Sequence, residues 1–142
     1  LRSYVESVKI PFIVKGVLSV ADAIKCAEIG AKGIIVSHHH GRLSYAIPPM
    51  MVLQDIKEEL KDKDIVIIVD CGITSGSDVF KALALGADAA AVGRSMIPFL
   101  EKDGVSGVKE YIESVGKELR FVMSATGFSK VSEIDESVLY EL

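Results

Sequence analysis

The sequence contains no tryptophan, only two cysteines among 142 residues, and no excess of positive charge. Because Cys26 and Cys71 are too few to build a disulfide framework, we expect a reducing, cytoplasmic setting. The net charge of -4 argues against a nucleic-acid-binding surface, which needs clustered basic residues. No apolar run reaches the roughly 18 residues of a membrane span, and no signal peptide is visible. We therefore expect neither a nucleic acid nor a membrane as partner.

Hydrophobic residues make up 49% of the chain, which suits a packed α/β protein rather than a disordered one. The length is enough for one domain with its own core, so we expect residues 1–142 to form a single domain. The chain begins with Leu1 rather than Met, and a strand pattern follows from Phe12. We expect this sequence to start inside a longer protein.

Four short apolar runs predict parallel strands that are buried on both faces, because they lack the polar alternation of a half-exposed strand. They span residues 12–14, 33–37, 65–70 and 89–93. Helical patterns follow each run: one capped by Ser19, one over 49–60, one capped by Ser77, and one over 105–124. The pattern therefore alternates strand and helix four times.

An internal repeat supports a barrel. The segment SVADAIKCAEIGAKGIIVS from Ser19 aligns without gaps with SGSDVFKALALGADAAAVG from Ser75, an offset of 56 residues or two strand–helix units. Alternate strands of a barrel fill the same interior layers, so a repeat every second unit is natural there. We predict an α/β fold that is the C-terminal half of a (β/α)8 TIM barrel, with a small open α/β sheet as the alternative.

Function in parallel α/β barrels lies where strands end and loops begin. The first strand ends in Lys15, which is either a solvated lysine or a cation that stabilises negative charge on a cofactor. The second ends in SHHHGR. Adjacent histidines on extended backbone alternate sides and have no carboxylate beside them, so we expect no metal site. A histidine can accept a proton near neutral pH, and Arg42 can hold a carboxylate with two hydrogen bonds.

The third and fourth strands end in glycine-rich turns, DCGITSGSD from Asp70 and the pair Gly93-Arg94. Glycines expose backbone N–H groups, and a following helix adds its dipole. The loops after the last two strands of a barrel are a frequent phosphate site. These two turns therefore predict a phosphate site, to which Arg94 adds a fixed positive charge.

Taken together, five segments resemble the FMN-dependent 2-hydroxy acid oxidising family, which includes glycolate oxidase, lactate oxidase and flavin-type L-lactate dehydrogenase. They are PFIVKG, GIIVSHHHGR, IVIIVDCGITSGSDVFKALALGAD, VGRSM and MSATGFSKVSEI. The resemblance runs from Phe12 to near Ile134. It implies FMN as cofactor and a small L-2-hydroxy acid, of lactate or glycolate type, as substrate.

The resemblance also implies residue roles. Lys15 matches the lysine at the flavin's pyrimidine edge, and Ser37 matches a flavin-contacting serine. The family pattern S-N-H-G-[GA]-R makes His39 the catalytic histidine and Arg42 the arginine that holds the substrate carboxylate. Asp70, Gly72, Gly93 and Arg94 match positions around the ribityl chain and phosphate. We expect Cys71, Ile73 and Thr74, in the same turn as Asp70, to complete the cofactor-binding set.

The sequence departs from the family pattern at several positions. The family's asparagine is His38 here, and the following glycine is His40. The family's D-G-G-V-R reads Asp70-Cys71-Gly72-Ile73-Thr74, so a phosphate-binding arginine is replaced by Thr74. The first four strand–helix units of the family are absent, and with them the tyrosines near the substrate, several flavin contacts and the aspartate that orients the catalytic histidine.

We therefore expect a half-barrel of an FMN-dependent dehydrogenase or oxidase that is inactive alone, partners a missing N-terminal half, and forms a homo-oligomer. One alternative is a phosphate-binding barrel related to type 2 isopentenyl diphosphate isomerase or IMP dehydrogenase. Both share the D-x-G-I stretch, but SHHHGR and VKG match the hydroxy acid family better. Another alternative is a non-catalytic, self-associating half-barrel fragment.

Overall fold

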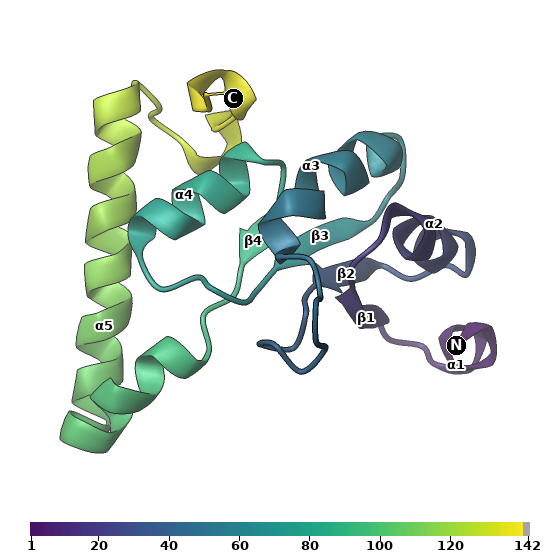
Figure 1. Cartoon of the computed structure of the whole chain (residues 1–142), viewed down its shortest axis with the longest axis horizontal. Helices are drawn as coiled ribbons and strands as arrows, with labels where there is room; N and C mark the ends of the chain where they lie inside the picture. Colours follow the sequence, from purple (N-terminus) through teal and green to yellow (C-terminus); the bar gives the residue numbers. More distant parts are fainter. Residues whose placement is uncertain (141–142) are drawn as a thin grey trace.

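The computed structural model describes residues 1–140, and its centre is one sheet of four parallel strands (Figure 1). Neighbouring strands follow chain order, so each connection crosses to the adjacent strand. The strands are β1 (Ile13–Val17), β2 (Gly33–Val36), β3 (Val66–Val69) and β4 (Ala89–Ala90). All three pairings are parallel. The expected alternation of four strands with helices is confirmed, in the form of an open sheet whose edges are β1 and β4.

Helices follow each strand, and a short one precedes the first. They are α1 (Arg2–Ser7), α2 (Val20–Glu28), α3 (Pro49–Leu60), α4 (Gly76–Ala84) and α5 (Ile97–Thr126), with 3-10 turns η1 (Arg94–Met96), η2 (Val131–Glu133) and η3 (Glu136–Val138). Ser19 caps α2 by accepting a hydrogen bond from the Asp22 N–H, as expected. None of the helices within residues 1–140 is both long and apolar enough to cross a membrane.

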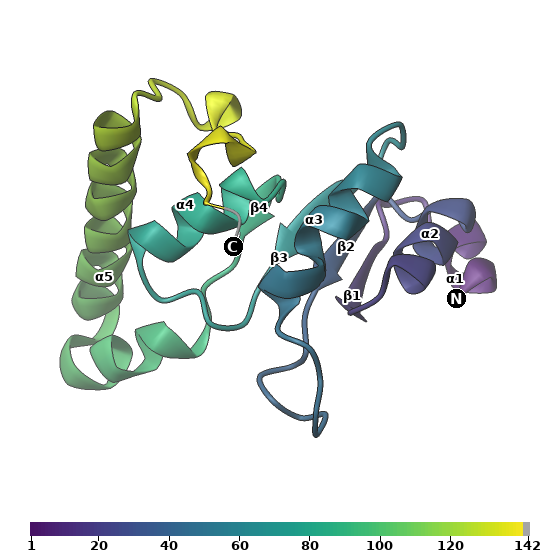
Figure 2. The ribbon, with the colours of Figure 1, turned by 45° about the horizontal axis from the view of Figure 1, so that its top comes forward.

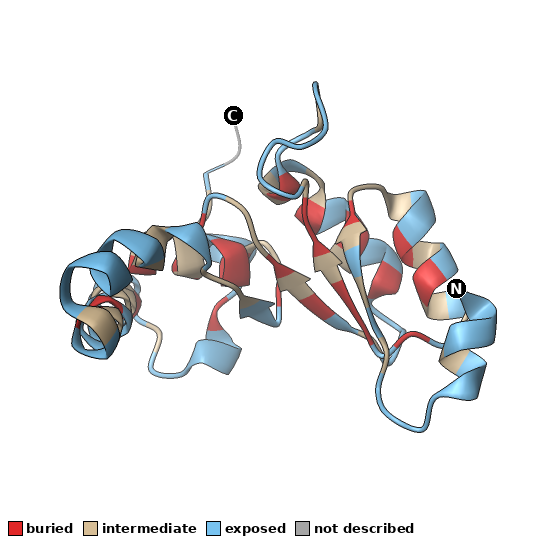
Figure 3. Cartoon of the chain, turned by 90° about the horizontal axis from the view of Figure 1, so that it is seen from below, coloured by how far each residue is buried: buried red, intermediate tan, exposed pale blue. Residues whose placement is uncertain are grey.

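Helices cover one face of the sheet and leave the other open (Figures 2 and 3). The strand side chains that point toward the helices are buried, and pack with residues of α2 and α3. They are Ile34, Val36, Ile67 and Val69. Because side chains alternate along a strand, the residues between them face the other way. On that face Ile13 is 47% exposed and Val66 is 46% exposed.

A second apolar cluster joins α4, α5 and the segment after α5. Phe80 and Leu83 of α4 pack with Met123 of α5 and with Ile134. Gln54 of α3 donates a hydrogen bond to Glu136, 2.7 Å away, so the C-terminal segment lies across α3 and α4. The long helix α5 thus packs on α4, outside the layer that covers the sheet (Figure 1).

Several expected element ends are wrong. The first strand extends to Val17 through an irregularity at Gly16, and the fourth is shorter than 89–93. Ser75, rather than Ser77, caps α4, because its side chain and that of Asp78 form a reciprocal capping box while the Ser77 hydroxyl bonds to Glu118. The last helical segment begins at Ile97, ahead of the expected residue 105, with a non-helical break at Gly104.

Candidate active site

The carboxyl ends of the strands enclose a cavity of about 330 Å³. It lies where the sequence predicts a site, because parallel strands bring their carboxyl ends to one edge of the sheet. Ten of the predicted site residues line it: Lys15, His39, Arg42, Asp70, Cys71, Gly72, Ile73, Thr74, Gly93 and Arg94. The other one, Ser37, is fully buried and hydrogen-bonds to Lys15 at the cavity wall.

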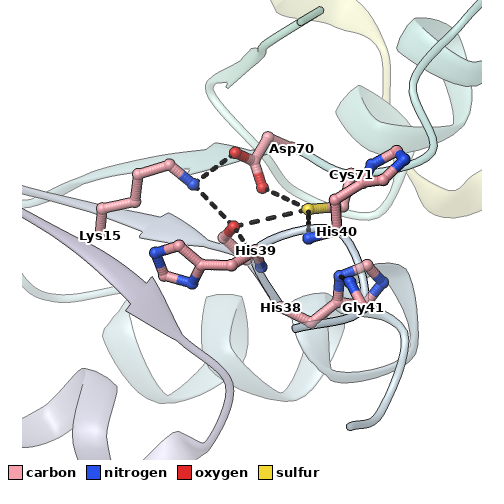
Figure 4. Close-up of polar contacts among 8 residues, drawn as sticks. Lys15, His38, His39, His40, Gly41, Asp70 and Cys71 are labelled. Carbon is pink, nitrogen blue, oxygen red and sulfur yellow. Dashed lines mark hydrogen bonds and ion pairs between the residues drawn. The ribbon is translucent and has the colours of Figure 1, made fainter. Parts of the chain in front are cut away.

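An ion pair lies in the wall of this cavity. The Lys15 ammonium donates to Asp70 Oδ2 at 2.5 Å and to Ser37 Oγ at 2.7 Å (Figure 4). Lys15 lies on β1, and Ser37 and Asp70 directly follow β2 and β3. Burial opposes ionisation of Asp70, but hydrogen bonds from Cys71 and Lys15 outweigh it, so the pKa of this carboxyl is lowered. Lys15 therefore has a charged partner, and its side chain remains 43% exposed.

Cys71 links two of the loops. Its thiol donates to Asp70 Oδ1 at 2.9 Å and accepts from the His40 N–H at 3.3 Å. Its backbone is left-handed, with φ of 69°. A glycine suits that conformation better, since a Cβ makes it unfavourable. The Cys71 side chain therefore requires a strained backbone, and the Cys71 thiol contacts both the end of β3 and the histidine loop.

The three histidines lie in three different surroundings (Figure 4). His38 Nδ1 accepts a hydrogen bond from the Gly41 N–H at 3.1 Å. The His39 N–H donates to Ser37 Oγ at 3.2 Å, and its ring lies over Gly16. His39 and His40 both have left-handed backbones, with φ of 53° and 59°. This tight turn directs the His39 ring toward the cavity that Lys15 also lines.

Gly16 is a site residue that sequence reasoning missed. A Cβ at this position would come within 2.6 Å of His39 Cε1. Its φ of 98° is in addition unfavourable for a side chain. The only signal in the sequence was the glycine directly after Lys15, which gave no reason to expect contact with the His39 loop.

The two arginines of the cavity differ from Lys15, since neither has a carboxylate partner among the described residues. Arg42 and Arg94 are both exposed and form no ion pair within residues 1–140. A guanidinium has five N–H donors in a planar fork that matches a carboxylate or phosphate. The two guanidinium groups are therefore free to bind anionic groups.

The glycine-rich turn at the end of β3 is held by Asp78. Asp78 Oδ2 accepts from the Thr74 N–H and the Thr74 hydroxyl, both at 3.0 Å, and from the Ser75 N–H at 3.1 Å. Burial opposes ionisation of Asp78, but these bonds lower the pKa of its carboxyl. The N–H and the hydroxyl of Thr74 are thus directed at Asp78, and the turn contributes no side-chain cation of its own.

The start of α4 is occupied by a carboxylate that sequence reasoning also missed. Glu118 of α5 accepts from the Gly76 N–H at 3.1 Å and the Ser77 N–H at 3.2 Å. Hydrogen bonds from the Ser77 hydroxyl and these N–H groups lower the pKa of Glu118. The N–H groups expected to face a ligand at this helix start are therefore already partly used.

The chain is similar to known proteins over nearly its whole length. A family model described as FMN-dependent dehydrogenase matches residues 1–141. The chain is 40% identical over 135 residues to the peroxisomal (S)-2-hydroxyacid oxidase GLO3 of Arabidopsis thaliana, covering 94% of this chain and 36% of that protein. It is 40% identical over 130 residues to the L-lactate dehydrogenase of a Caulobacter species, covering 91% of this chain and 34% of that protein.

Among solved structures, a mandelate oxidase variant carrying a monooxide FMN adduct superposes with a TM-score of 0.90 at 36% identity. The match covers 95% of this chain and 43% of that one. The chain therefore spans between a third and a half of the length of the proteins it matches.

Proposed function

The chain belongs to the FMN-dependent dehydrogenase family, and we propose that it supplies the C-terminal half of a (β/α)8 barrel that oxidises a small L-2-hydroxy acid. The observation that carries the proposal is one cavity at the strand ends, of about 330 Å³. It gathers a candidate base, His39, a candidate carboxylate-binding group, Arg42, and two further cations, Lys15 and Arg94. The relatives' names, which include lactate, mandelate and 2-hydroxy acids, support this substrate class.

The residues present fit FMN. Lys15 lies on β1, at one end of the cavity, where a cation can stabilise negative charge on a flavin ring. Arg94 follows β4, at the other end, where it can pair with a phosphate. Between them Gly72 and Gly93 line the cavity, and a Cβ on either would meet no atom within 4 Å. Backbone at these two positions therefore faces open space, which leaves room for a ribityl chain and phosphate. When bound, FMN supplies the acceptor for two electrons and the substrate's α-hydrogen.

The chain's own residues would do the acid–base and binding work. Arg42 would hold the carboxylate of the substrate by a paired hydrogen bond. His39 Nε2 or Nδ1 would accept the proton of the 2-hydroxyl group as the carbonyl of the 2-oxo acid forms. The His39 N–H, bonded to Ser37, and the close fit of the ring over Gly16 would fix the position of this base. Lys15 would stabilise the negative charge that builds up nearby.

The other half of the barrel would supply what this chain lacks. The sheet has two free edges and an uncovered face, so four further strand–helix units could close it. We further propose a cytoplasmic location, with which the unpaired state of Cys26 and Cys71 is compatible. We expect the isolated chain to carry no visible flavin and to bind FMN or phosphate weakly. If the purified chain held FMN tightly and in a one-to-one ratio, the proposal that the two halves of the barrel share the flavin site would be contradicted.

Activity is tested in a complete barrel. Residues 1–140 would replace the matching C-terminal segment of the Caulobacter L-lactate dehydrogenase, and oxidation of lactate and glycolate would be measured. Loss of the base in His39→Ala should lower kcat by about 10²- to 10⁴-fold. Arg42→Lys should chiefly raise KM, because a point charge replaces a fork.

The neighbouring histidines provide matched controls. His38→Ala and His40→Ala should retain most of the turnover, since neither ring lies over Gly16 beside Lys15. If either of these variants is inactive while His39→Ala has near-normal kinetics, then His39 is not the base. A chimera that binds FMN but oxidises no 2-hydroxy acid would refute the proposed reaction.

A further inference from the structure

One tyrosine joins the two loops at the Arg94 end of the cavity. The hydroxyl of Tyr111, on α5, lies 3.0 Å from the Thr74 carbonyl oxygen and 2.7 Å from Ser95 Oγ. Ser95 Oγ in turn lies 3.4 Å from the Ile73 carbonyl oxygen. Ile73 and Thr74 belong to the loop after β3, and Ser95 to the turn after β4; all three line the cavity. A single buried phenol therefore bridges the two loops.

The start of α5 holds the ring of Tyr111 in place on the side away from the two loops. Gly104 has φ of 60° and ψ of -137°, which breaks α5 and reverses the chain. A Cβ on Gly107 would lie 2.2 Å from the Phe99 carbonyl oxygen, so only glycine allows the two segments to pack this closely. As a result the ring of Phe99 stacks on that of Tyr111, with centroids 4.8 Å apart and planes 27° apart. Stacking of this kind holds the ring while its hydroxyl reaches the loops.

Glu118 provides a second anchor from the same helix, but to a different place. It binds N–H groups of Gly76 and Ser77 and so holds the start of α4. Within residues 1–140, no hydrogen bond from Glu118 reaches the turn after β4. Tyr111 is thus the α5 side chain that sets the spacing between the two loops, whereas Glu118 sets the position of α4.

The spacing matters because this end of the cavity has few cations. The N–H and the hydroxyl of Thr74 are bonded to Asp78, which leaves Arg94 as the side-chain cation there. A phosphate would depend on this guanidinium and on those backbone N–H groups of the two loops that do not already bond to Asp78 or Glu118. Such a set of donors binds well only if its members are held in place beforehand.

We propose that Tyr111 is a positioning residue for the phosphate group of the cofactor, acting through the loops at Thr74 and Ser95. The proposal rests on the proposed function, because it assumes that FMN binds in this cavity. It assigns to Tyr111 no contact with the flavin ring, which would lie toward Lys15. The hydroxyl should therefore affect a ligand with a phosphate and not one without.

The test compares FMN with riboflavin, which has the same ring and ribityl chain but no phosphate. The full chain, in excess, would be titrated against each flavin by fluorescence quenching. Tyr111→Phe keeps the ring that stacks on Phe99 and removes only the hydroxyl. We expect it to weaken FMN binding by about 2- to 10-fold, the size of one hydrogen bond, and to leave riboflavin binding unchanged. Tyr4→Phe, at an exposed position on α1, is the matched control and should change neither.

Two results would overturn the inference while leaving the proposed function intact. One is equal FMN binding by Tyr111→Phe and the wild-type chain. The other is an equal loss of FMN and riboflavin binding, which would indicate a general structural role. A wild-type chain that binds FMN no better than riboflavin would overturn the phosphate site at this end of the cavity, and with it the inference; the proposed function is tested separately, by the activity of the chimera.

Discussion

The imidazole of His39 lies directly over Gly16, where an added Cβ would stand 2.6 Å from His39 Cε1. Gly16 marks the irregularity in β1, since the register with β2 shifts between Lys15 and Val17. The left-handed backbone at Gly16 therefore does two things: it turns the strand after Lys15 and it leaves room for the ring of the proposed base. Both features place the lysine and the histidine at one cavity.

Replacing Gly16 by alanine should displace the His39 ring. The φ of 98° alone makes a side chain costly, by about 1–3 kcal/mol of unfolding free energy. The clash adds a specific effect, a change in the His39 Cε1–H resonance in the NMR spectrum. Gly127→Ala is the matched control, because Gly127 has φ of 86° but nothing within 4 Å of its Cβ. It should lose comparable stability with His39 unchanged; an unshifted His39 resonance in Gly16→Ala would contradict the close contact.

The lowered pKa of Asp70 predicts a pH dependence of stability. Because the folded-state pKa lies below the unfolded value of about 3.9, the contribution is present above that pH and is lost as pH falls through the folded pKa. Asp70→Asn should remove this acid-side slope in chemical denaturation between about pH 4 and the folded pKa. The matched control is Asp64→Asn, since Asp64 also has a lowered pKa, from its bond to Lys32, but its side chain is 95% exposed. Water screens that pair, so Asp64→Asn should change the slope less; equal changes would refute the role of burial.

The order of strands and helices could be predicted because it depends on local patterns. Continuous apolar runs indicated strands buried on both faces, and the expected bounds of α3 agree with the structure. Element ends were less predictable, since they depend on contacts distant in sequence. Ser77 resembles a cap in the sequence, but Glu118, which lies 41 residues further on, takes its hydroxyl. The internal repeat already paired Ser19 with Ser75, and both serines do cap their helices.

The residues that line the cavity could be predicted from the sequence, whereas the residues that hold them in position could not. Strand ends identify Lys15, the run of three histidines and Arg94 because parallel strands bring their ends together, and the resemblance to the family pattern selects His39 within the run. Gly16 and Tyr111 could not be found in this way. The contact of Gly16 with His39 requires a turn of left-handed residues, and that of Tyr111 with Thr74 requires the reversal at Gly104. Both depend on tertiary geometry that no sequence spacing expresses.

The capping box of α4 predicts a graded response to serine substitution. Ser75→Ala removes the acceptor for the Asp78 N–H and should cost about 0.5–2 kcal/mol of unfolding free energy. It also frees Asp78 from one partner and so should loosen the turn at Thr74. Ser19→Ala is the matched comparison, because Ser19 caps α2 in the same way but without the reciprocal bond from the acidic side chain. Thermal and chemical denaturation would measure the loss of unfolding free energy in the two variants. A smaller loss for Ser75→Ala than for Ser19→Ala would contradict the view that the reciprocal bond of the capping box adds stability.

The free edges of the sheet predict self-association. Both β1 and β4 carry unpaired backbone groups along one side, and such edges tend to pair with another chain. The uncovered face adds apolar surface, with Ile13 and Val66 each almost half exposed. The chain is itself a twofold repeat, so two copies can pair edge to edge around a common axis, a frequent arrangement for homo-oligomers. We therefore expect a dimer or larger species in place of a 15.3 kDa monomer.

Analytical ultracentrifugation over a range of concentrations would measure this association, and charge placement tests its location. Val66→Lys puts an ammonium on the uncovered face, at the start of β3, where burial against a second copy would require desolvating it. The variant should raise the dissociation constant of the self-association by at least about tenfold. A desolvation cost of only about 1.4 kcal/mol is enough for a tenfold change. Val105→Lys is the matched control, because Val105 is 84% exposed on α5, away from the sheet, and should leave the association unchanged. A single species of 15.3 kDa at every concentration, or equal effects of the two lysines, would mean that the open face does not drive self-association.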